Sequence, residues 1–140
     1  MKKHHTISLT LLALVLAVGL FSLYQNIGGG KLAEDFQFIT EPSRTQEISD
    51  AADAVVRSFK DFRGATMTTL RYVDGASSSE KDNWAERYDK DQGLYFTCDF
   101  VTDDTAEQSH LNANSSYQGW FWRVARSNGG HWTIVSSGQG

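Results

Sequence analysis

The pattern of apolar and polar residues divides the chain into three parts. From Ile7 to Tyr24, eighteen residues follow one another without a charge. A helix of that length reaches roughly 27 Å, close to the thickness of the hydrocarbon layer of a bilayer. Beyond residue 44 the apolar residues recur with the periods of amphipathic helices and strands. We therefore expect a transmembrane signal anchor in residues 1–26, a flexible linker in 27–44 and a folded domain in 45–140. A short extended piece at Phe36–Ile39 is an alternative within the linker.

The N-terminal run also predicts how the chain is placed in the cell. Lys2-Lys3 precedes it, whereas Lys31 is balanced by Glu34 and Asp35. The positive-inside bias then predicts a single pass through the cell membrane, with the N-terminus in the cytoplasm and the domain outside. A cleaved secretory signal is the alternative, although the small residues Ala17-Val18-Gly19 would direct cleavage inside the run. An uncleaved anchor is favoured, and both interpretations export the same domain.

A long amphipathic helix is predicted after the linker. Its apolar positions recur at spacings of three and four, which puts them on one face: Ile48, Ala52, Val55, Phe59 and Phe62. Thr45 is the expected N-cap, and Gly64 supplies a left-handed stop. This helix is expected to cover one face of a sheet.

The segment Tyr117–Ser136 is expected to form a β-hairpin. Two runs rich in aromatic and β-branched residues flank Ser127-Asn128-Gly129-Gly130, and Asn-Gly suits the positive-φ positions of a type I′ turn. By the strand period of two, one face carries the large apolar residues: Trp120, Trp122, Val124, Trp132 and Ile134. A hairpin face of this kind needs a cover, because an isolated hairpin is marginally stable.

Three further elements complete the predicted domain. Ala65–Val73 is a strand by its Thr, Tyr and Val content, and a short helix carrying Trp84 and Tyr88 follows it. Leu94–Thr102 alternates as a central strand does. Neighbouring strands joined by loops favour antiparallel pairing. The predicted fold class is α+β: an N-terminal transmembrane helix, then an antiparallel sheet of about four strands packed on one long amphipathic helix.

Charge and composition exclude several functions. Acidic side chains outnumber basic ones by 17 to 13, and no basic stripe interrupts that balance, so nucleic acid is not an expected partner. Cys98 is the only cysteine, and on the apolar face of its strand it is expected to be a buried, inert thiol. His110 and His131 lack the spacing of a metal site or an acid–base pair. We expect no cofactor, no metal and no catalytic residue.

The folded part of the chain contains several distinctive short motifs: Phe59-Lys60-Asp61-Phe62, Thr66–Tyr72, Trp84–Tyr88, Leu111–Tyr117 and Gly130-His131-Trp132. Together they resemble a family of uncharacterised exported proteins of Gram-positive bacteria, over roughly Thr45 to Gly138. That family is similar to the nuclear transport factor 2 and cystatin-like α+β rolls, which implies such a roll here. Many of its members resemble lipoproteins, and this chain departs from them because it lacks the acylated cysteine. The resemblance implies no catalytic residue.

The sheet face that one helix cannot cover is the first candidate site. It is expected to carry Tyr95, Phe121 and Arg123, a mixture of apolar and polar side chains typical of a modest interaction surface. Arg123 is expected to pair with an acid opposite, such as Asp99. The first hypothesis is a membrane-tethered, non-enzymatic domain that binds another cell-envelope protein or forms a homodimer.

A pocket inside the roll is the second candidate site. Its walls would be the rings of Trp84, Tyr88, Trp120 and Trp122, and the chain would then be a small-ligand carrier or an enzyme. Core filling is the competing interpretation of the same rings, because a domain of this size without disulfides needs large buried side chains. A water-accessible cavity of roughly 300 Å³ lined by these rings would separate the two.

Overall fold

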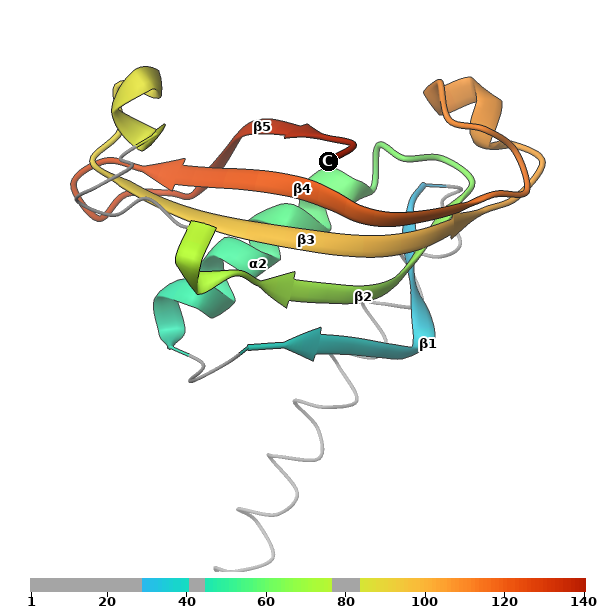
Figure 1. The fold of residues 1–140 in the computed structure, drawn as a ribbon, viewed down its shortest axis with the longest axis horizontal. Helices are drawn as coiled ribbons and strands as arrows, with labels where there is room; N and C mark the ends of the chain where they lie inside the picture. The colour runs from blue at the N-terminus through green and yellow to red at the C-terminus, as the bar shows by residue number, and fades with distance from the viewer. Residues whose placement is uncertain (1–28, 41–44, 77–83) are drawn as a thin grey trace, which may run out of the picture.

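The computed structural model describes residues 29–40, 45–76 and 84–140, which form a mixed five-stranded sheet and one α-helix (Figure 1). The strands are β1 (Lys31–Ile39), β2 (Ala65–Tyr72), β3 (Gln92–Thr102), β4 (Ser116–Arg126) and β5 (Thr133–Gly138), and the helix is α2 (Gln46–Phe59). Three short 3-10 helices connect them: η1 (Asp74–Ala76), η2 (Trp84–Tyr88) and η3 (Ala106–Ser109). The strands lie in chain order, with β3 at the centre of the sheet.

The predicted fold class is wrong in its sheet and in its helix. β1 pairs with β2 in parallel and only the other three pairs are antiparallel, so the sheet is mixed rather than antiparallel and has five strands rather than about four. Parallel neighbours require a crossover, and α2 provides it between β1 and β2. α2 spans 14 residues, an ordinary length, so the described residues do not contain the long helix that was predicted.

The prediction of a transmembrane helix also requires correction. Among residues 29–40, 45–76 and 84–140, no helix is both long enough and apolar enough to cross a membrane. The predicted membrane and signal-anchor character therefore has no counterpart in the described residues. The run Ile7–Tyr24 on which it depended lies outside the described residues, and the expected placement of the domain outside the cytoplasm stays a prediction.

Within the segment predicted as a linker, Lys31–Ile39 forms edge strand β1, and Gly30 packs beside the end of α2. The Gly30 N–H donates to the Lys60 carbonyl at 2.9 Å. A Cβ atom at Gly30 would lie only 2.0 Å from the Phe59 carbonyl oxygen, so this position requires glycine for a close backbone approach. Residues 29–40, which the sequence assigns to the flexible linker, are therefore part of the fold.

α2 begins where its capping residue predicts. The Thr45 hydroxyl accepts a hydrogen bond from the Ile48 N–H at 3.2 Å, so Thr45 is confirmed as the N-cap. Ile48, Val55 and Phe59 are at most 6% exposed and belong to the same buried cluster as Trp122 and Phe96 of the sheet. The helix thereby covers one face of the sheet, which we call the inner face.

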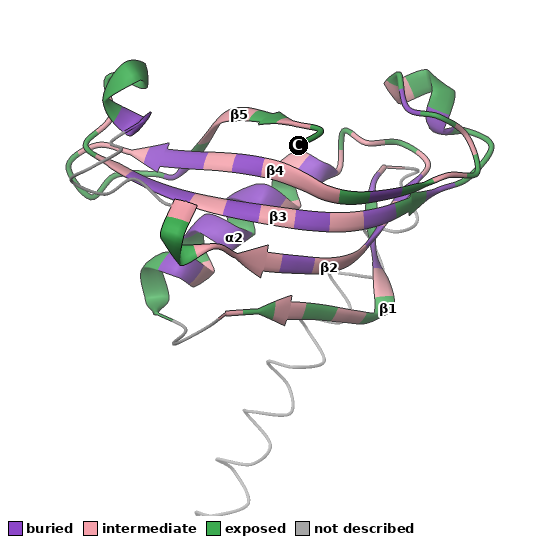
Figure 2. Ribbon diagram, in the orientation of Figure 1, coloured by how far each residue is buried: buried purple, intermediate pink, exposed green. Residues whose placement is uncertain are grey.

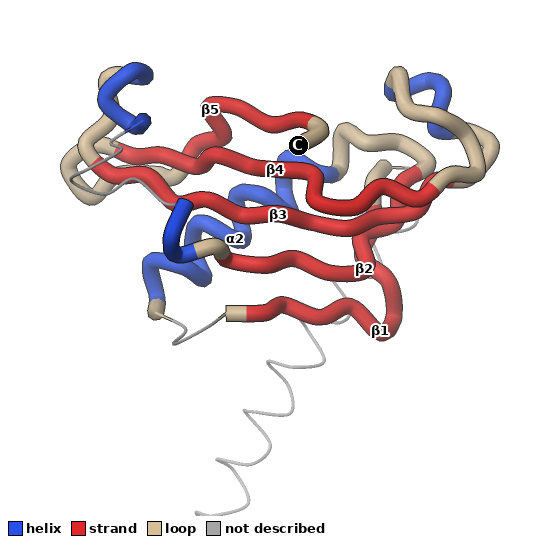
Figure 3. The backbone as a smooth tube through the Cα atoms, viewed as in Figure 1, coloured by secondary structure: helices blue, strands red, loops and turns tan. Residues whose placement is uncertain are grey.

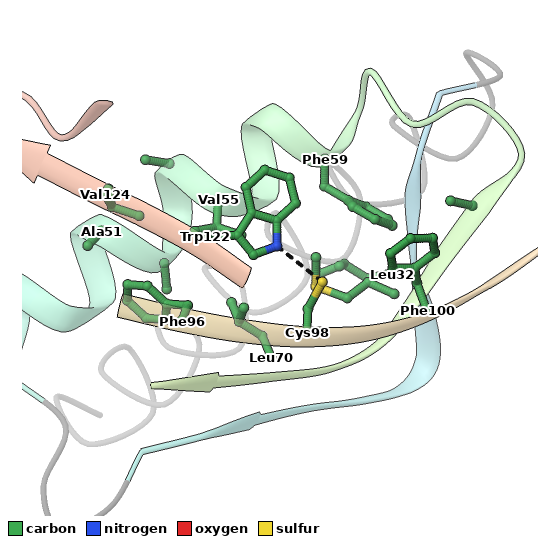
Figure 4. Close-up of a cluster of buried hydrophobic side chains, with 14 of the residues drawn as sticks. Leu32, Ala51, Val55, Phe59, Leu70, Phe96, Cys98, Phe100, Trp122 and Val124 are labelled. Atoms are coloured by element: carbon green, nitrogen blue, oxygen red, sulfur yellow. Dashed lines mark hydrogen bonds between the residues drawn. The ribbon is translucent and has the colours of Figure 1, made fainter. Parts of the chain in front are cut away.

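β3 alternates between the two faces of the sheet (Figure 2). Its even-numbered residues from Leu94 to Phe100 are buried on the inner face, as predicted. Cys98 lies among them, next to the Trp122 indole, whose Nε1–H points to Sγ at 3.1 Å (Figure 4). Burial raises the pKa of the Cys98 thiol to about 12, so the prediction of a buried thiol is confirmed and the group stays protonated near neutral pH.

The hairpin turn is confirmed in detail. Asn128 and Gly129 both have positive φ, 54° and 67°, and the Gly130 N–H donates to the Ser127 carbonyl at 3.0 Å. These are the features of a type I′ turn. The turn is held to the start of β3, because the Asn128 N–H donates to the Asp91 carboxylate at 3.0 Å. The tip of the hairpin is therefore fixed in place.

Candidate functional site

The face of the sheet opposite α2, which we call the outer face, brings together the residues predicted as an interaction surface. The strand register aligns Arg71 of β2, Thr97 of β3, Phe121 of β4 and Gly138 of β5 in one row across the sheet. Tyr95 lies one step along β3 on the same face, opposite Arg123. The strands run side by side across this face (Figure 3).

An aromatic stack forms the middle of the outer face. The rings of Tyr95 and Phe121 lie 6.0 Å apart between centroids with only 10° between their planes. Both side chains are half-buried. The Arg123 guanidinium lies 5.5 Å from the Phe121 centroid, within reach of a cation–π contact. Tyr95, Phe121 and Arg123 thus form one continuous group, as the sequence predicts.

The same arginine also contacts a second ring. Its guanidinium lies 5.6 Å from the ring of Trp84, so the cation lies between Trp84 and Phe121. The Arg123 Nε–H is buried and has no hydrogen-bond partner among the described residues. The guanidinium is thus held by aromatic faces rather than by a carboxylate.

Trp84 is placed on the outer face by a glycine. A Cβ atom at Gly93 would lie 2.6 Å from the Trp84 ring, so the indole lies directly on the bare backbone of β3. The Trp84 Nε1–H donates to the Ala76 carbonyl at 3.0 Å, and the ring packs with Ala125 and Val135 in a small buried cluster. Trp84 therefore closes one end of the outer face.

An ion pair forms the other charged part of this face. Arg71 Nη2 donates to Asp99 Oδ2 at 2.6 Å, and Asp99 Oδ1 accepts the Gly119 N–H at 3.0 Å. The hydrogen bond from Arg71 holds the pKa of Asp99 below its ordinary value. The predicted pairing of Asp99 with Arg123 is wrong, because the register places Arg123 opposite Tyr95 and brings Asp99 next to β2.

The four rings predicted as pocket walls lie in different places. Trp84 packs on the outer face, whereas Trp122, at 1% exposure, is part of the core under α2. Trp120 is half-buried against the same core, next to Phe62 at 5.4 Å between centroids. Tyr88 is 37% exposed at the end of η2. The sheet separates Trp84 from Trp122, so these residues do not line a common cavity.

A polar pocket that sequence reasoning missed lies between α2 and the hairpin turn. Its volume is about 260 Å³, and it is lined by Asp50, Asp53 and Arg57 of the helix and by Arg126, Gly129–Gly130, His131 and Trp132 of the hairpin. The acidic and basic residues of α2 appear in the sequence as ordinary solvated positions. Only the position of the hairpin relative to the helix reveals the pocket.

Within the described parts of the chain, no cluster of three or more His, Cys, Asp or Glu residues is placed to hold a metal ion. His110 is exposed in a left-handed conformation at the end of η3, and His131 is exposed at the polar pocket. The Asp103 carboxylate accepts hydrogen bonds from the Thr105 side chain and N–H, which lower its pKa.

The long connection between β3 and β4 is an ordered structure. The buried residues Ala106 and Leu111 anchor it to the core, and the Tyr117 hydroxyl accepts the Asn112 N–H at 2.9 Å. The Thr102 hydroxyl donates to the Asn112 carbonyl at 2.6 Å. These contacts fix the base of the loop.

Comparisons with known proteins give no relative for this arrangement: no family model, curated protein or solved structure matches the chain. The resemblance to exported proteins of Gram-positive bacteria therefore stays a prediction.

Proposed function

We propose that the folded part of this chain is a non-enzymatic protein-binding domain that associates with a second copy of itself through the outer face. The observation that supports this proposal is the group of Tyr95, Phe121 and Arg123, which lies half-buried on the sheet face opposite the helix. Aromatic residues and arginine are the side chains most enriched at interface centres.

The position of Phe121 favours a symmetric pair. Phe121 lies on β4, the second strand from the β5 edge of the sheet. The row of aligned residues that contains Phe121 runs from Gly138 on β5 to Arg71 on β2. A two-fold axis through this row places the Phe121 ring of one copy against the same ring, or against Tyr95, of the other. Arg71 and Asp99 flank this group with polar side chains, as expected of an interface rim.

A weak and reversible association is the expected form of this interaction. The centre of the face consists of two rings, and its surroundings are charged, so it lacks the extensive apolar area of an obligate dimer. We therefore expect dissociation constants nearer to micromolar than to nanomolar values, about −8 kcal/mol of binding free energy.

The four rings named for the alternative function, a ligand carrier or enzyme, do not surround one pocket. Trp84 and Trp122 lie on opposite faces of the sheet, and the latter fills the core. A second form of the proposal is that a different protein, instead of a second copy of this chain, binds the outer face through the same residues.

Site-directed cross-linking tests the symmetric arrangement. Phe121→Cys places a thiol at the proposed two-fold axis, and Asp50→Cys places a matched thiol on the exposed side of α2. The native Cys98 is fully buried and should not interfere. We expect mild oxidation to give a disulfide-linked dimer of the Phe121→Cys variant much faster than of the Asp50→Cys variant. Equal rates would contradict association through the outer face.

A further inference from the structure

The polar pocket between α2 and the hairpin turn carries charges of both signs. Arg57 and Arg126 contribute guanidinium groups, and Asp50 and Asp53 contribute carboxylates from the exposed side of the helix. Trp132 provides an aromatic wall and is only 6% exposed. This composition differs from that of the outer face, where aromatic rings predominate.

Arg126 is held rigidly at this pocket. Its Nε–H donates to Gln92 Oε1 at 2.7 Å, its Nη2 pairs with Glu47 at 3.1 Å, and its guanidinium lies 4.3 Å from the Trp132 centroid. Gln92 in turn donates to the Glu47 carboxylate at 3.2 Å. None of these contacts uses Nη1. A guanidinium fixed by several partners can bind a carboxylate with little loss of side-chain entropy.

The helix α2 contributes side chains of both signs to the pocket, Asp50, Asp53 and Arg57. Asp50 accepts a hydrogen bond from Gln46 at 2.8 Å, and its carboxylate lies exposed at the pocket. Arg57 has no ion-pair partner among the described residues. A purely anionic ligand would be repelled by the two aspartates, and a purely cationic one by the two arginines. A ligand with separated charges of both signs can place its negative charge near the arginines and its positive charge near an aspartate.

We propose that this pocket binds a small zwitterion, an amino acid or short peptide whose carboxylate meets Arg126 and Arg57 and whose ammonium group meets Asp50. Its volume of about 260 Å³ sets the size limit. Pockets for drug-sized ligands measure about 300–1,000 Å³, so a ligand of one or two residues fits this one better. The site lies on the helix side of the sheet, and it does not depend on association through the outer face.

The probe that tests this proposal is glycylglycine, titrated into the full chain. NMR follows the amide signals of Gly129 and Gly130 and the indole signal of Trp132. We expect a dissociation constant of about 1 mM, typical of small ligands held by few contacts. N-acetylglycylglycine keeps only the negative charge and glycylglycinamide only the positive one. Each should bind at least about tenfold more weakly, because a charge-assisted hydrogen bond is lost.

Two variants and one control assign the binding to this pocket. Arg57→Gln and Asp50→Asn lie on the exposed side of α2 and should each weaken glycylglycine binding by about tenfold without changing the fold. Arg87→Gln removes a similar exposed charge on η2 and should leave binding unchanged. The proposal is overturned if the three probes bind equally, if no pocket signal shifts at about 10 mM probe, or if Arg57→Gln behaves as Arg87→Gln does.

Discussion

The Trp84 ring lies directly on Gly93, so closely that a Cβ atom at position 93 would be 2.6 Å from it. This contact fixes the 3-10 helix η2 on the outer face of the sheet and positions one of the two rings that enclose the Arg123 guanidinium. A single hydrogen atom in place of a methyl group thus decides the shape of that end of the face.

Gly93→Ala is expected to displace Trp84. The added methyl group cannot be accommodated, because the neighbouring atoms belong to a rigid ring in a buried cluster. We expect a loss of about 1–3 kcal/mol in the free energy of unfolding and a red-shifted tryptophan emission. Gly75→Ala is the matched control, since nothing lies within 4 Å of a Cβ atom there. Equal stability of the two variants would show that Trp84 does not pack as described.

Phe59→Ala tests the contact between α2 and the sheet. Phe59 is 1% exposed and packs edge-on to Phe100 at 5.5 Å between centroids. The cavity left by the ring should cost about 3–5 kcal/mol of stability, measured by urea unfolding. Asp61→Ala, an exposed position just beyond the helix, should change stability by less than about 0.5 kcal/mol. A midpoint unchanged by Phe59→Ala would refute this packing.

The sequence predicts the inner face of the sheet better than it predicts the topology. Leu94, Phe96 and Phe100 alternate with polar residues, and such a pattern identifies a half-buried strand whatever its neighbours are. β1 does not show this alternating pattern. Leu32 is its only buried residue, and its pairing with β2 is irregular between Leu32 and Gln37. Without β1, a parallel pair and its crossover helix cannot be inferred.

The candidate site shows the same limit. Alternation alone predicts one face for Tyr95, Phe121 and Arg123, and the structure places them together. The partner of Asp99 depended on register, and an irregularity in β2 between Met67 and Thr69 sets that register. Propensity and alternation carry no information about which residue of a neighbouring strand lies opposite.

The Arg71–Asp99 pair gives a pH dependence with a defined sign. The pKa of Asp99 is lowered in the folded protein, so the stabilisation is complete above the unfolded pKa, about 3.9, and is lost as the pH falls through the lower folded value. Asp99→Asn should therefore cost about 1 kcal/mol at neutral pH, a modest value because Arg71 is partly exposed.

Unfolding curves of both proteins check this prediction. The difference between wild type and Asp99→Asn should be constant above about pH 5 and shrink below about pH 4. A difference that persists unchanged at pH 2 would show that it does not come from the charge of Asp99.

Cys98 is expected to resist alkylation in the native protein. Burial raises its pKa from the ordinary 9.0 to about 12, so very little thiolate is present at pH 8. Iodoacetamide labelling followed by mass spectrometry should be slow in buffer and rapid in denaturing urea. Rapid native labelling would mean that the thiol is exposed and charged, contrary to its position beside Trp122.

The central claim is self-association through the outer face. The most direct test is sedimentation equilibrium of the full chain and of its Phe121→Asp and Tyr88→Asp variants. Phe121 lies in the aromatic stack, whereas Tyr88 is an exposed ring on η2 outside it. Any association that involves other parts of the chain is common to all three proteins. We predict a reversible dimer for wild type and Tyr88→Asp. For Phe121→Asp we predict association at least about 100-fold weaker, shifted towards monomer, because a charge would be buried at the centre of the interface. Identical association of all three proteins, or a wild type that stays monomeric at millimolar concentration, would contradict the claim.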